Sequence, residues 1–542
     1  MKQRLFLKPG KKKKIKSIIE QSMKTLLMNS KAWLGKNTFT EAIGLDSSTG
    51  KIIFLGSDHD ANEFKNEYNE VIDLKKKLVI PAFTDGHCHF IKGALVNSQL
   101  NLRDAKTKAD FENGIKKYMK YKKSGWIYGG YFSDSNFKEA IPLNLKFLDE
   151  ICDDVPIIIS KFDMHSAFAN SKAIEMSGIM DKENDFTLDE LVKNNDGPTG
   201  ELKERAMNFV TNNIPPASIK ERTDIAQQQL AKLHSQGITA ISDITLVEDL
   251  EIYKEMIKQN KLLLRIDARL PFTEFENIEK YKNEFDNLTE SIKFNSFKAF
   301  YDGSLSSKTA YMHENYKNSN YNGIRTEYVN SGVFFNAAVE IDKAGFQASV
   351  HAIGDKAVTE LLDLNEELIL KNGNRDRRFR IEHAQHIRKR DFQRFKDLNV
   401  IASVQPSHLF SDAKTSTQIL EDHTLEHNYK KFFDIGARVC FGTDFPVVSE
   451  NPFETIYYAM TRKAEGFEEG FVPENRIALT DCLEAYTIEN AYATYDEKLR
   501  GNLEVGKLAD IAVLENNIFE MSPEDIRNAK VSMTYFNGER VF

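Results

Sequence analysis

The sequence predicts an α/β fold, a parallel barrel of alternating strands and helices. Eight short apolar runs alternate with charged amphipathic stretches of helical length in the middle of the 542-residue chain, the pattern of repeated strand–helix units. Three of the runs end in His or Asp, a fourth is followed closely by His87 and His89, and the reactive face of a parallel barrel is built at the carboxyl ends of its strands. The expected strands are Leu78–Phe83, Ile238–Ile244, Leu262–Leu270, Phe294–Phe300, Phe346–His351, Phe379–His383, Val400–Gln405 and Val439–Asp444.

Two β-rich flanks enclose the expected barrel. Short apolar runs separated by Gly, Ser and Asp fill residues 22–80, and the same sequence pattern recurs in residues 491–542. Such runs are typical of short strands joined by tight turns. We therefore divide the chain into a basic extension (1–21), a first β flank (22–80), a barrel (81–490) and a second β flank (491–542).

The first and second barrel strands are separated by about 150 residues, which exceeds an ordinary strand–helix connection. We interpret about 91–235 as an insertion over the barrel mouth, since long connections at that end commonly act as lids. The insertion contains two candidate strands, Trp126–Phe132 and Val155–Phe162.

The composition is that of a soluble globular protein, with 41% hydrophobic and 28% charged residues. Its cysteines show no C-x-x-C spacing, so neither a disulfide framework nor a cysteine zinc site is indicated. A reducing compartment fits this usage, and we expect a cytoplasmic protein. No run of eighteen apolar residues occurs, so no membrane span is expected. The cysteines are Cys88, Cys152, Cys440 and Cys482.

Charge is distributed unevenly along the chain. The first twenty residues hold eight Lys or Arg and one acid, so the remainder is more acidic than the formal net charge of −8. An acidic body argues against nucleic acid as the partner, and we expect a small-molecule substrate and a possible homo-oligomer. The basic start lacks the apolar core of a signal peptide; we interpret it as a mobile or weakly helical extension.

The expected strand ends carry residues that suit a metal site. His87 and His89 lie two apart, so both imidazoles point to the same side of a strand. His351, His383 and Asp444 end three later strands. These nitrogen and oxygen ligands suit one or two divalent ions such as Zn²⁺. Such an ion lowers the pKa of bound water and polarises a carbonyl, and Asp444 can accept the proton of that water and return it to the leaving group.

We interpret Glu382 and five other histidines as structural or surface residues rather than metal ligands. Glu382 adjoins His383, and strand alternation places it on the opposite face. The remaining histidines that we interpret as surface or structural are His234, His386, His408, His423 and His427.

These motifs resemble the amidohydrolase superfamily. The resemblance lies in the H-x-H after an apolar strand and in Val350–Ala357, Arg380–Gln385 and Phe441–Pro446. The segment Phe297–Ala310 narrows it to amidohydrolase family 3, which includes N-substituted formamide deformylase. The resemblance implies a distorted (β/α)8 TIM barrel with a small β-sandwich domain assembled from both flanks.

By position, the resemblance also assigns roles to the metal-type residues. It makes His87 and His89 ligands of the more buried metal, and His351 and His383 ligands of the second, while Asp444 contacts both metal and water.

The resemblance further implies that Lys298 is carboxylated and bridges two metals. A lysine buried beside cations loses its proton readily, and the carbamate replaces a positive charge by a bridging anion. Lys161 in the insertion is a rival for this role.

Substrate residues are suggested within the insertion. His165 lies in a segment that resembles one near the substrate in the family, and Trp126 and Tyr131 are candidates for an aromatic pocket. The alternatives are a hydrogen-bonded structural histidine and an aromatic core. Ser306 and Lys308 stand where the family often has Gly and Arg, a difference that bears on substrate preference or on the local turn.

The resemblance implies a hydrolase of carbon–nitrogen bonds other than peptide bonds, acting by metal-hydroxide attack on an amide-like carbonyl. One alternative is a one-metal deaminase of the same superfamily, which would not need Lys298. Another is a non-enzymatic regulatory protein on a hydrolase scaffold that uses the basic extension as its contact. Against the latter, every metal-type position is filled.

Overall fold

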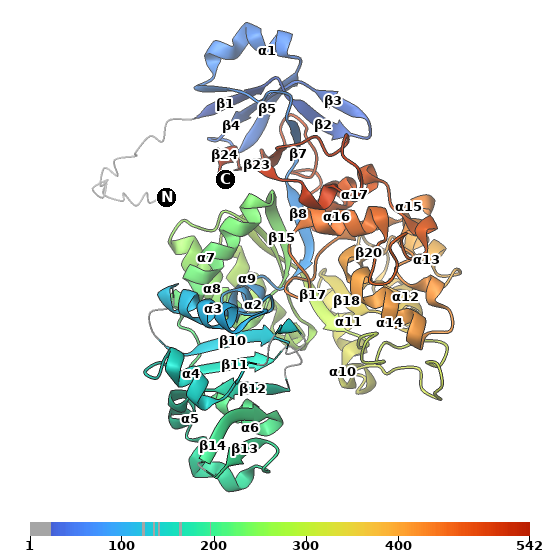
Figure 1. The fold of residues 1–542 in the computed structure, drawn as a ribbon. Helices are drawn as coiled ribbons and strands as arrows, with labels where there is room; N and C mark the ends of the chain where they lie inside the picture. Colours follow the sequence, from blue (N-terminus) through green and yellow to red (C-terminus); the bar gives the residue numbers. More distant parts are fainter. Residues whose placement is uncertain (1–22, 122–124, 134–135, 139–140, 162–164, 196) are drawn as a thin grey trace, which may run out of the picture.

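A barrel of eight parallel strands forms the centre of the molecule, as the computed structural model shows for residues 23–542 apart from 122–124, 134–135, 139–140, 162–164 and 196 (Figure 1). Sequential strands are neighbours throughout, so the predicted barrel is confirmed. The predicted basic extension lies outside the described residues. The strands are β8 (Phe83–Cys88), β15 (Ile238–Ile244), β16 (Arg265–Pro271), β17 (Ile292–Phe300), β18 (Gln347–Ala352), β19 (Arg380–His383), β20 (Ile401–Val404) and β21 (Arg438–Phe441).

The barrel is nearly closed by contacts between β8 and the segment after β21. The Thr443 hydroxyl donates to Asp85 Oδ2 over 2.5 Å, and the Asp444 amide donates to the His87 carbonyl over 2.6 Å. A Cβ at Gly442 would lie 2.4 Å from the His87 nitrogen, so this close approach requires glycine. The seam therefore holds the first and the last predicted metal ligands side by side.

The first expected strand is in fact two strands, and this corrects the prediction of one run over Leu78–Phe83. The segment β7 (Leu78–Pro81) pairs with strands of the flanks, and β8 begins at Phe83. The Ala82 amide still donates to the Asp510 carbonyl of the flank, whereas the Phe83 amide donates to the Gly237 carbonyl beside the barrel. The apolar run continues through this change of partner because both sheets bury it.

The two flanks build two sheets that share one hydrophobic cluster. The four-stranded sheet has the order β5–β4–β1–β6, and the six-stranded sheet has the order β24–β23–β22–β7–β2–β3. Leu27 and Ile43 of the first sheet pack in one cluster with Val79 and Ile511 of the second. The remaining strands are β1 (Lys24–Met28), β2 (Lys31–Gly35), β3 (Thr38–Thr40), β4 (Ala42–Asp46), β5 (Lys51–Gly56), β6 (Glu70–Asp73), β22 (Ile511–Leu514), β23 (Val531–Phe536) and β24 (Glu539–Arg540).

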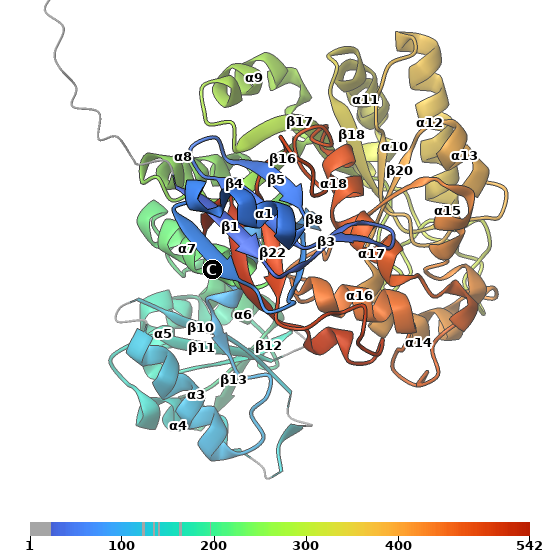
Figure 2. The same cartoon turned by 90° about the horizontal axis from the view of Figure 1, so that it is seen from above.

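The insertion forms a lobe with a six-stranded sheet, in the order β13–β14–β12–β11–β10–β9. Figures 1 and 2 show this lobe beside the barrel, on the side away from helices α12 (Asp355–Asn372) and α13 (Phe392–Asp397). Its elements are β9 (Leu100–Asn101), α3 (Lys108–Tyr121), β10 (Ile127–Phe132), α4 (Leu145–Ile151), β11 (Ile157–Lys161), β12 (Ser166–Ala169), α5 (Ser171–Ser177), β13 (Leu191–Asn194), β14 (Gly197–Lys203) and α6 (Glu204–Asn212).

Amphipathic helices cover the outside of the barrel, and most of them contribute to its main hydrophobic cluster. Helix α7 (Ile219–Ser235) begins where the Ser218 hydroxyl accepts a hydrogen bond from the Glu221 amide, which caps its first turn. Across the part of the chain that the structure describes, no helix combines the length and the hydropathy of a membrane span. Other covering helices are α2 (Phe90–Asn97), α8 (Leu250–Lys258), α9 (Ile278–Asp286), α11 (Val333–Lys343), α14 (Leu409–Ile419), α15 (Lys430–Ile435), α16 (Pro452–Thr461), α17 (Leu479–Tyr486) and α18 (Ile488–Ala493).

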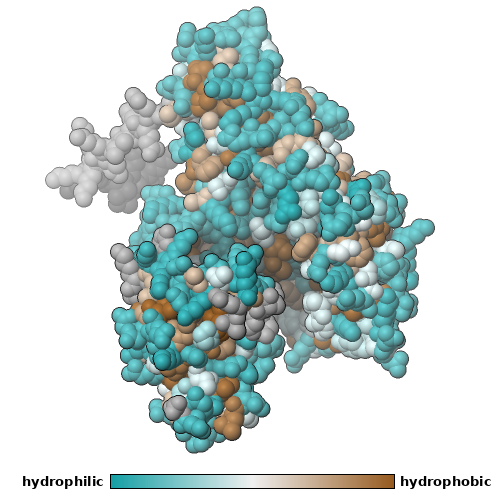
Figure 3. Space-filling model, in the orientation of Figure 1, coloured by the Kyte–Doolittle hydropathy of each residue, from teal (hydrophilic) through white to brown (hydrophobic). Residues whose placement is uncertain are grey.

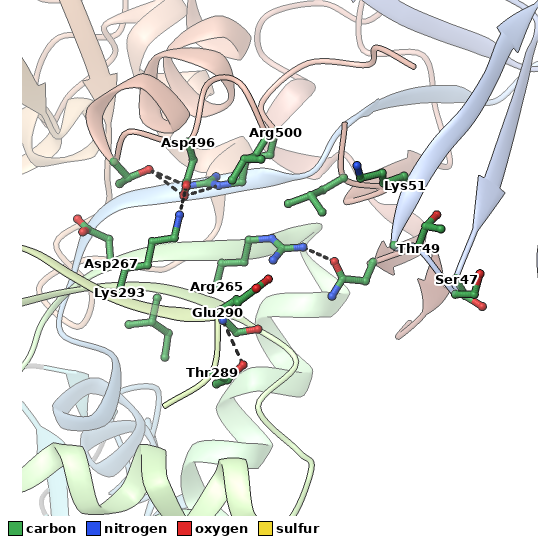
Figure 4. Close-up of a pocket in the computed structure, with 18 residues that line it drawn as sticks. Ser47, Thr49, Lys51, Arg265, Asp267, Thr289, Glu290, Lys293, Asp496 and Arg500 are labelled. Atoms are coloured by element: carbon green, nitrogen blue, oxygen red, sulfur yellow. Dashed lines mark hydrogen bonds and ion pairs between the residues drawn. The ribbon is translucent and has the colours of Figure 1, made fainter. Parts of the chain in front are cut away.

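A cavity of about 790 Å³ lies where the first flank meets the amino ends of β16 and β17 (Figure 4). Its walls carry paired charges: Asp496 accepts from Arg500 Nε over 3.2 Å and also contacts Lys293. None of the predicted metal ligands lines it. The amino-terminal face of such a barrel serves stability rather than chemistry, and the contact of Asp496 with Lys293 joins the second flank to the barrel.

Candidate metal centre

The first group of ligand-type side chains lies at the seam of the barrel. Both His87 Nε2 and His89 Nε2 face Asp444 Oδ1, at 3.4 and 3.3 Å. One donor atom from each of the three residues lies within 4.8 Å of the other two. His87 ends the inner face of β8, His89 follows that strand, and Asp444 follows β21. The structure therefore places these predicted ligands at one point.

A second group shares Asp444 with the first. His383 at the end of β19, His408 and Asp444 also have donor atoms within 4.8 Å of one another. His408 Nε2 lies 3.9 Å from Asp444 Oδ2, and the ring of His351 lies 4.4 Å from that of His383. His408 follows β20, the seventh barrel strand, and its place just beyond that strand end is the signal that sequence reasoning missed.

Hydrogen bonds hold one ring nitrogen of two histidines at this centre. His87 Nδ1 contacts a carboxylate oxygen of Glu382, and His351 Nε2 lies 3.1 Å from the Gly303 carbonyl. Burial and the neighbouring Lys298 lower the pKa of His351 to about 3, and burial holds the pKa of His383 well below its usual range. Neutral imidazoles are the form that binds metal.

Glu382 corrects the expectation that it faces away from the predicted ligands. It is fully buried inside the barrel, where it contacts His87, Arg269 and Arg380. Burial favours its neutral form, but the two arginines and His87 outweigh burial and hold its pKa well below the usual range. Side chains alternate between the two faces of β19 only as far as Glu382, because the next residue, His383, has a φ of 70°. Glu382 therefore holds His87 in place, as carboxylates commonly do for metal-binding histidines.

We expect Glu382→Gln to weaken metal binding about tenfold to a hundredfold, because the carboxylate no longer orients His87. The same change leaves two buried arginines without their anion and should lower the free energy of unfolding by about 3–5 kcal/mol. Metal titration and denaturant unfolding measure the two effects. An exposed glutamate in the insertion, changed in Glu175→Gln, is the control; an unchanged metal affinity in Glu382→Gln would contradict the role.

Lys298 lies beneath the histidines at the inner face of β17. It is 3% exposed, and its amine has no hydrogen-bond partner among the described residues. Burial lowers the pKa of Lys298 to about 7. Its rival Lys161 instead lies in the insertion, with its amine 5.7 Å from the ring centre of Phe168.

The polar atoms left over at this centre fit a divalent metal. Within the described chain, Lys298 Nζ, His383 Nδ1 and His408 Nε2 are all buried without a hydrogen-bond partner. Buried polar atoms are costly when unpaired. A metal ion would satisfy the two imidazole nitrogens, which converge with the Asp444 carboxylate, and such nitrogen and oxygen donors suit borderline metals.

The backbone around the centre is held in an unfavourable conformation. His383, Ala384 and Asp444 have φ values of 70°, 41° and 61°, in the left-handed region that side chains with a Cβ rarely adopt. Such residues gather at functional sites, where the surrounding packing holds them.

The suggested substrate residues lie in the insertion lobe. Trp126 is buried in a hydrophobic cluster with Ile158, and the Tyr131 hydroxyl contacts Gln99. His165 is exposed, and its Nδ1 lies 3.0 Å from Glu204. Substrate contact by these three residues stays a prediction.

Comparisons with known proteins agree with this geometry. A family model described as "Amidohydrolase family" matches residues 70–542. Protein LONG AFTER FAR-RED 3 of Arabidopsis thaliana is 30% identical over 536 residues, 95% of this chain and 91% of that protein. N-substituted formamide deformylase of Arthrobacter pascens is 22% identical over 511 residues, 91% of this chain and 93% of that protein.

Among solved structures, an uncharacterized metal-dependent hydrolase from Pyrococcus furiosus has the same fold. It superposes with a TM-score of 0.74 and 23% identity, covering 92% of this chain and 100% of that one. Since the family model spans most of the sequence, the chain belongs to the amidohydrolase family.

Proposed function

We propose that this chain is a hydrolase of carbon–nitrogen bonds other than peptide bonds, acting on an amide-like substrate with one or two divalent ions, most suitably Zn²⁺. The observation that carries the proposal is the sharing of Asp444 by two histidine groups at the carboxyl end of the barrel. Reactive groups gather at this end in enzymes with such barrels.

The proposed ligands of a first ion are His87 and His89, and those of a second are His351 and His383, with Asp444 at both. A divalent ion in such a site lowers the pKa of a coordinated water and polarises a carbonyl. His383 Nδ1 supports this assignment, because it is buried without a hydrogen-bond partner among the described residues.

We assign to Asp444 the transfer of the proton from water to the leaving group. Burial opposes its ionisation, but contacts with His87 and His89 outweigh burial and hold its pKa well below the usual range, so the carboxylate is ready to accept a proton. It can then return that proton to the leaving nitrogen. His408 Nε2 lies 3.9 Å from Asp444 Oδ2, close enough for an electrostatic interaction with this carboxylate.

We expect Lys298 to take up CO2 at neutral pH. With a pKa of about 7, about half of its amine is neutral at pH 7; the amine adds to CO2, forms a carbamate and releases one proton. At a fixed partial pressure of CO2, uptake of a second metal should rise between pH 6 and pH 8, because the neutral fraction of the amine rises through its pKa. Elemental analysis after reconstitution measures the ratio of metal to protein.

The control is Lys298→Met, which keeps the approximate length of the side chain but lacks the amine. In this variant, uptake of the second metal should no longer depend on CO2. A second metal bound equally well without CO2 would rule out the carbamate. A single ion under all conditions would favour the one-metal deaminase.

The proposed activity is tested with a panel of amides, N-substituted formamides first, since one relative is named for that activity. Turnover should require metal, and chelation followed by metal addition should remove and restore it. No turnover of any amide by fully metal-loaded protein would favour the regulatory alternative.

We further propose a cytoplasmic location. Its support is that all four cysteines are free and buried, as expected for a reducing compartment. Fractionation of source cells with an antibody against the chain tests this; recovery outside the cytoplasm would contradict it.

A further inference from the structure

Phe300 presents an exposed aromatic ring directly beside the metal centre. It is the last residue of β17, and strand alternation places Ser296, Lys298 and Phe300 on the same inner face. The centre of its ring lies 4.5 Å from Lys298 Nζ and 5.4 Å from the ring of His351. The side chain thus stands above the lysine, at the opening of the barrel.

The exposure of this ring is unusual for its strand. Phe300 is 47% exposed, whereas Phe294 and Phe297 are 8% and 0% exposed. Aromatic side chains mainly fill interiors, where each buries a large apolar area. An exposed ring in contact with convergent polar groups is a feature of ligand pockets, whose walls are mostly apolar with a few placed polar atoms.

Other apolar side chains are exposed at the same end of the barrel. Leu246 follows β15 and is 41% exposed, and Val447 follows Asp444 and is 67% exposed. The Val447 amide donates to the Asp444 carbonyl over 2.8 Å, which ties this side chain to the centre. Figure 3 shows hydrophobic surface within the hollow between the insertion lobe and the barrel.

The geometry points to a subsite for an aromatic group attached to the amide-like bond of the substrate, with Phe300 as its wall. The inference rests on the proposed function, because the metal centre would hold the amide end. A ring stacked on Phe300 gains contact energy beyond the area that it buries, so an aromatic group is favoured over an alkyl group of similar size.

Two hydroxamic acids test the subsite by binding alone. Propanohydroxamic acid and 3-phenylpropanohydroxamic acid carry the same metal-chelating group and differ only in the phenyl ring. Calorimetry with metal-loaded protein should show the phenyl compound binding at least about tenfold tighter, since a buried ring removes a large apolar area from water. In Phe300→Ala the two affinities should agree within about threefold, and Phe300→Leu should give an intermediate ratio.

Leu370→Ala is the matched control, because Leu370 is 84% exposed on α12 and its removal should leave the preference intact. Equal affinities in the wild type, or a preference that survives Phe300→Ala, would overturn the subsite. Elemental analysis before each titration separates the two proposals: protein without metal contradicts the proposed function and the subsite that rests on it, whereas metal-loaded protein without discrimination contradicts the subsite alone.

Discussion

Replacement of Asp444 by Asn should lower turnover by about a hundredfold or more, the scale of general acid–base catalysis. The amide keeps the size of the side chain and one oxygen that can bind a metal, but it cannot accept a proton at neutral pH. Because His87, His89 and His383 surround this position, we expect metal content to change much less than kcat. Steady-state kinetics on a responsive amide, paired with elemental analysis, measure both.

A second carboxyl group provides the control for that experiment. Asp302 is buried near His351 and accepts hydrogen bonds from the amides of Ile353 and Gly354, so Asp302→Asn alters a carboxylate of the centre that takes no part in the proposed proton transfer. It should retain more turnover than Asp444→Asn. Near-wild-type kcat in metal-loaded Asp444→Asn would show that another group carries the proton, and His165 would then be tested first.

The double variant His87→Ala, His89→Ala should lose the ion at the seam of the barrel, and activity with it. Both imidazoles face Asp444 Oδ1 within 3.4 Å, and a carboxylate left without them is a poor site for a borderline metal. Elemental analysis of the purified double variant should show at least one equivalent of metal per chain fewer than in the wild type.

His59→Ala is the control for this loss, since His59 lies exposed in the first flank, outside the barrel strands that carry the proposed ligands. It should retain full metal content. Circular dichroism of the double variant would show whether the fold survives. Full metal retention in the folded double variant would reject the assignment of His87 and His89.

The family is recognised from local motifs because each motif is a strand end, and strand ends can be located from sequence. An apolar run followed by His or Asp marks the end of a barrel strand, and the ends of parallel strands place such side chains at the carboxyl-terminal face of the barrel. His87, His351, His383 and Asp444 were located in this way, and the structure brings all four to one centre.

Other features depend on partners that are remote in the sequence. The split of Leu78–Phe83 is set by a hydrogen bond to Asp510 in the second flank, and local hydropathy is the same on both sides of it. The lobe built by the insertion brings Trp126 into a hydrophobic cluster. From the sequence alone, Trp126 could belong either to the core or to an aromatic pocket.

The sequence by itself determined the barrel, the family and the strand ends that supply most of the proposed ligands, because periodicity and motif spacing are local properties. Only the tertiary structure decided that Glu382 supports His87, because the positive φ of His383 breaks the alternation. It also decided that His408 joins the centre and that Phe300 stays exposed beside it, because the neighbours of a side chain at the barrel mouth come from loops whose paths depend on packing.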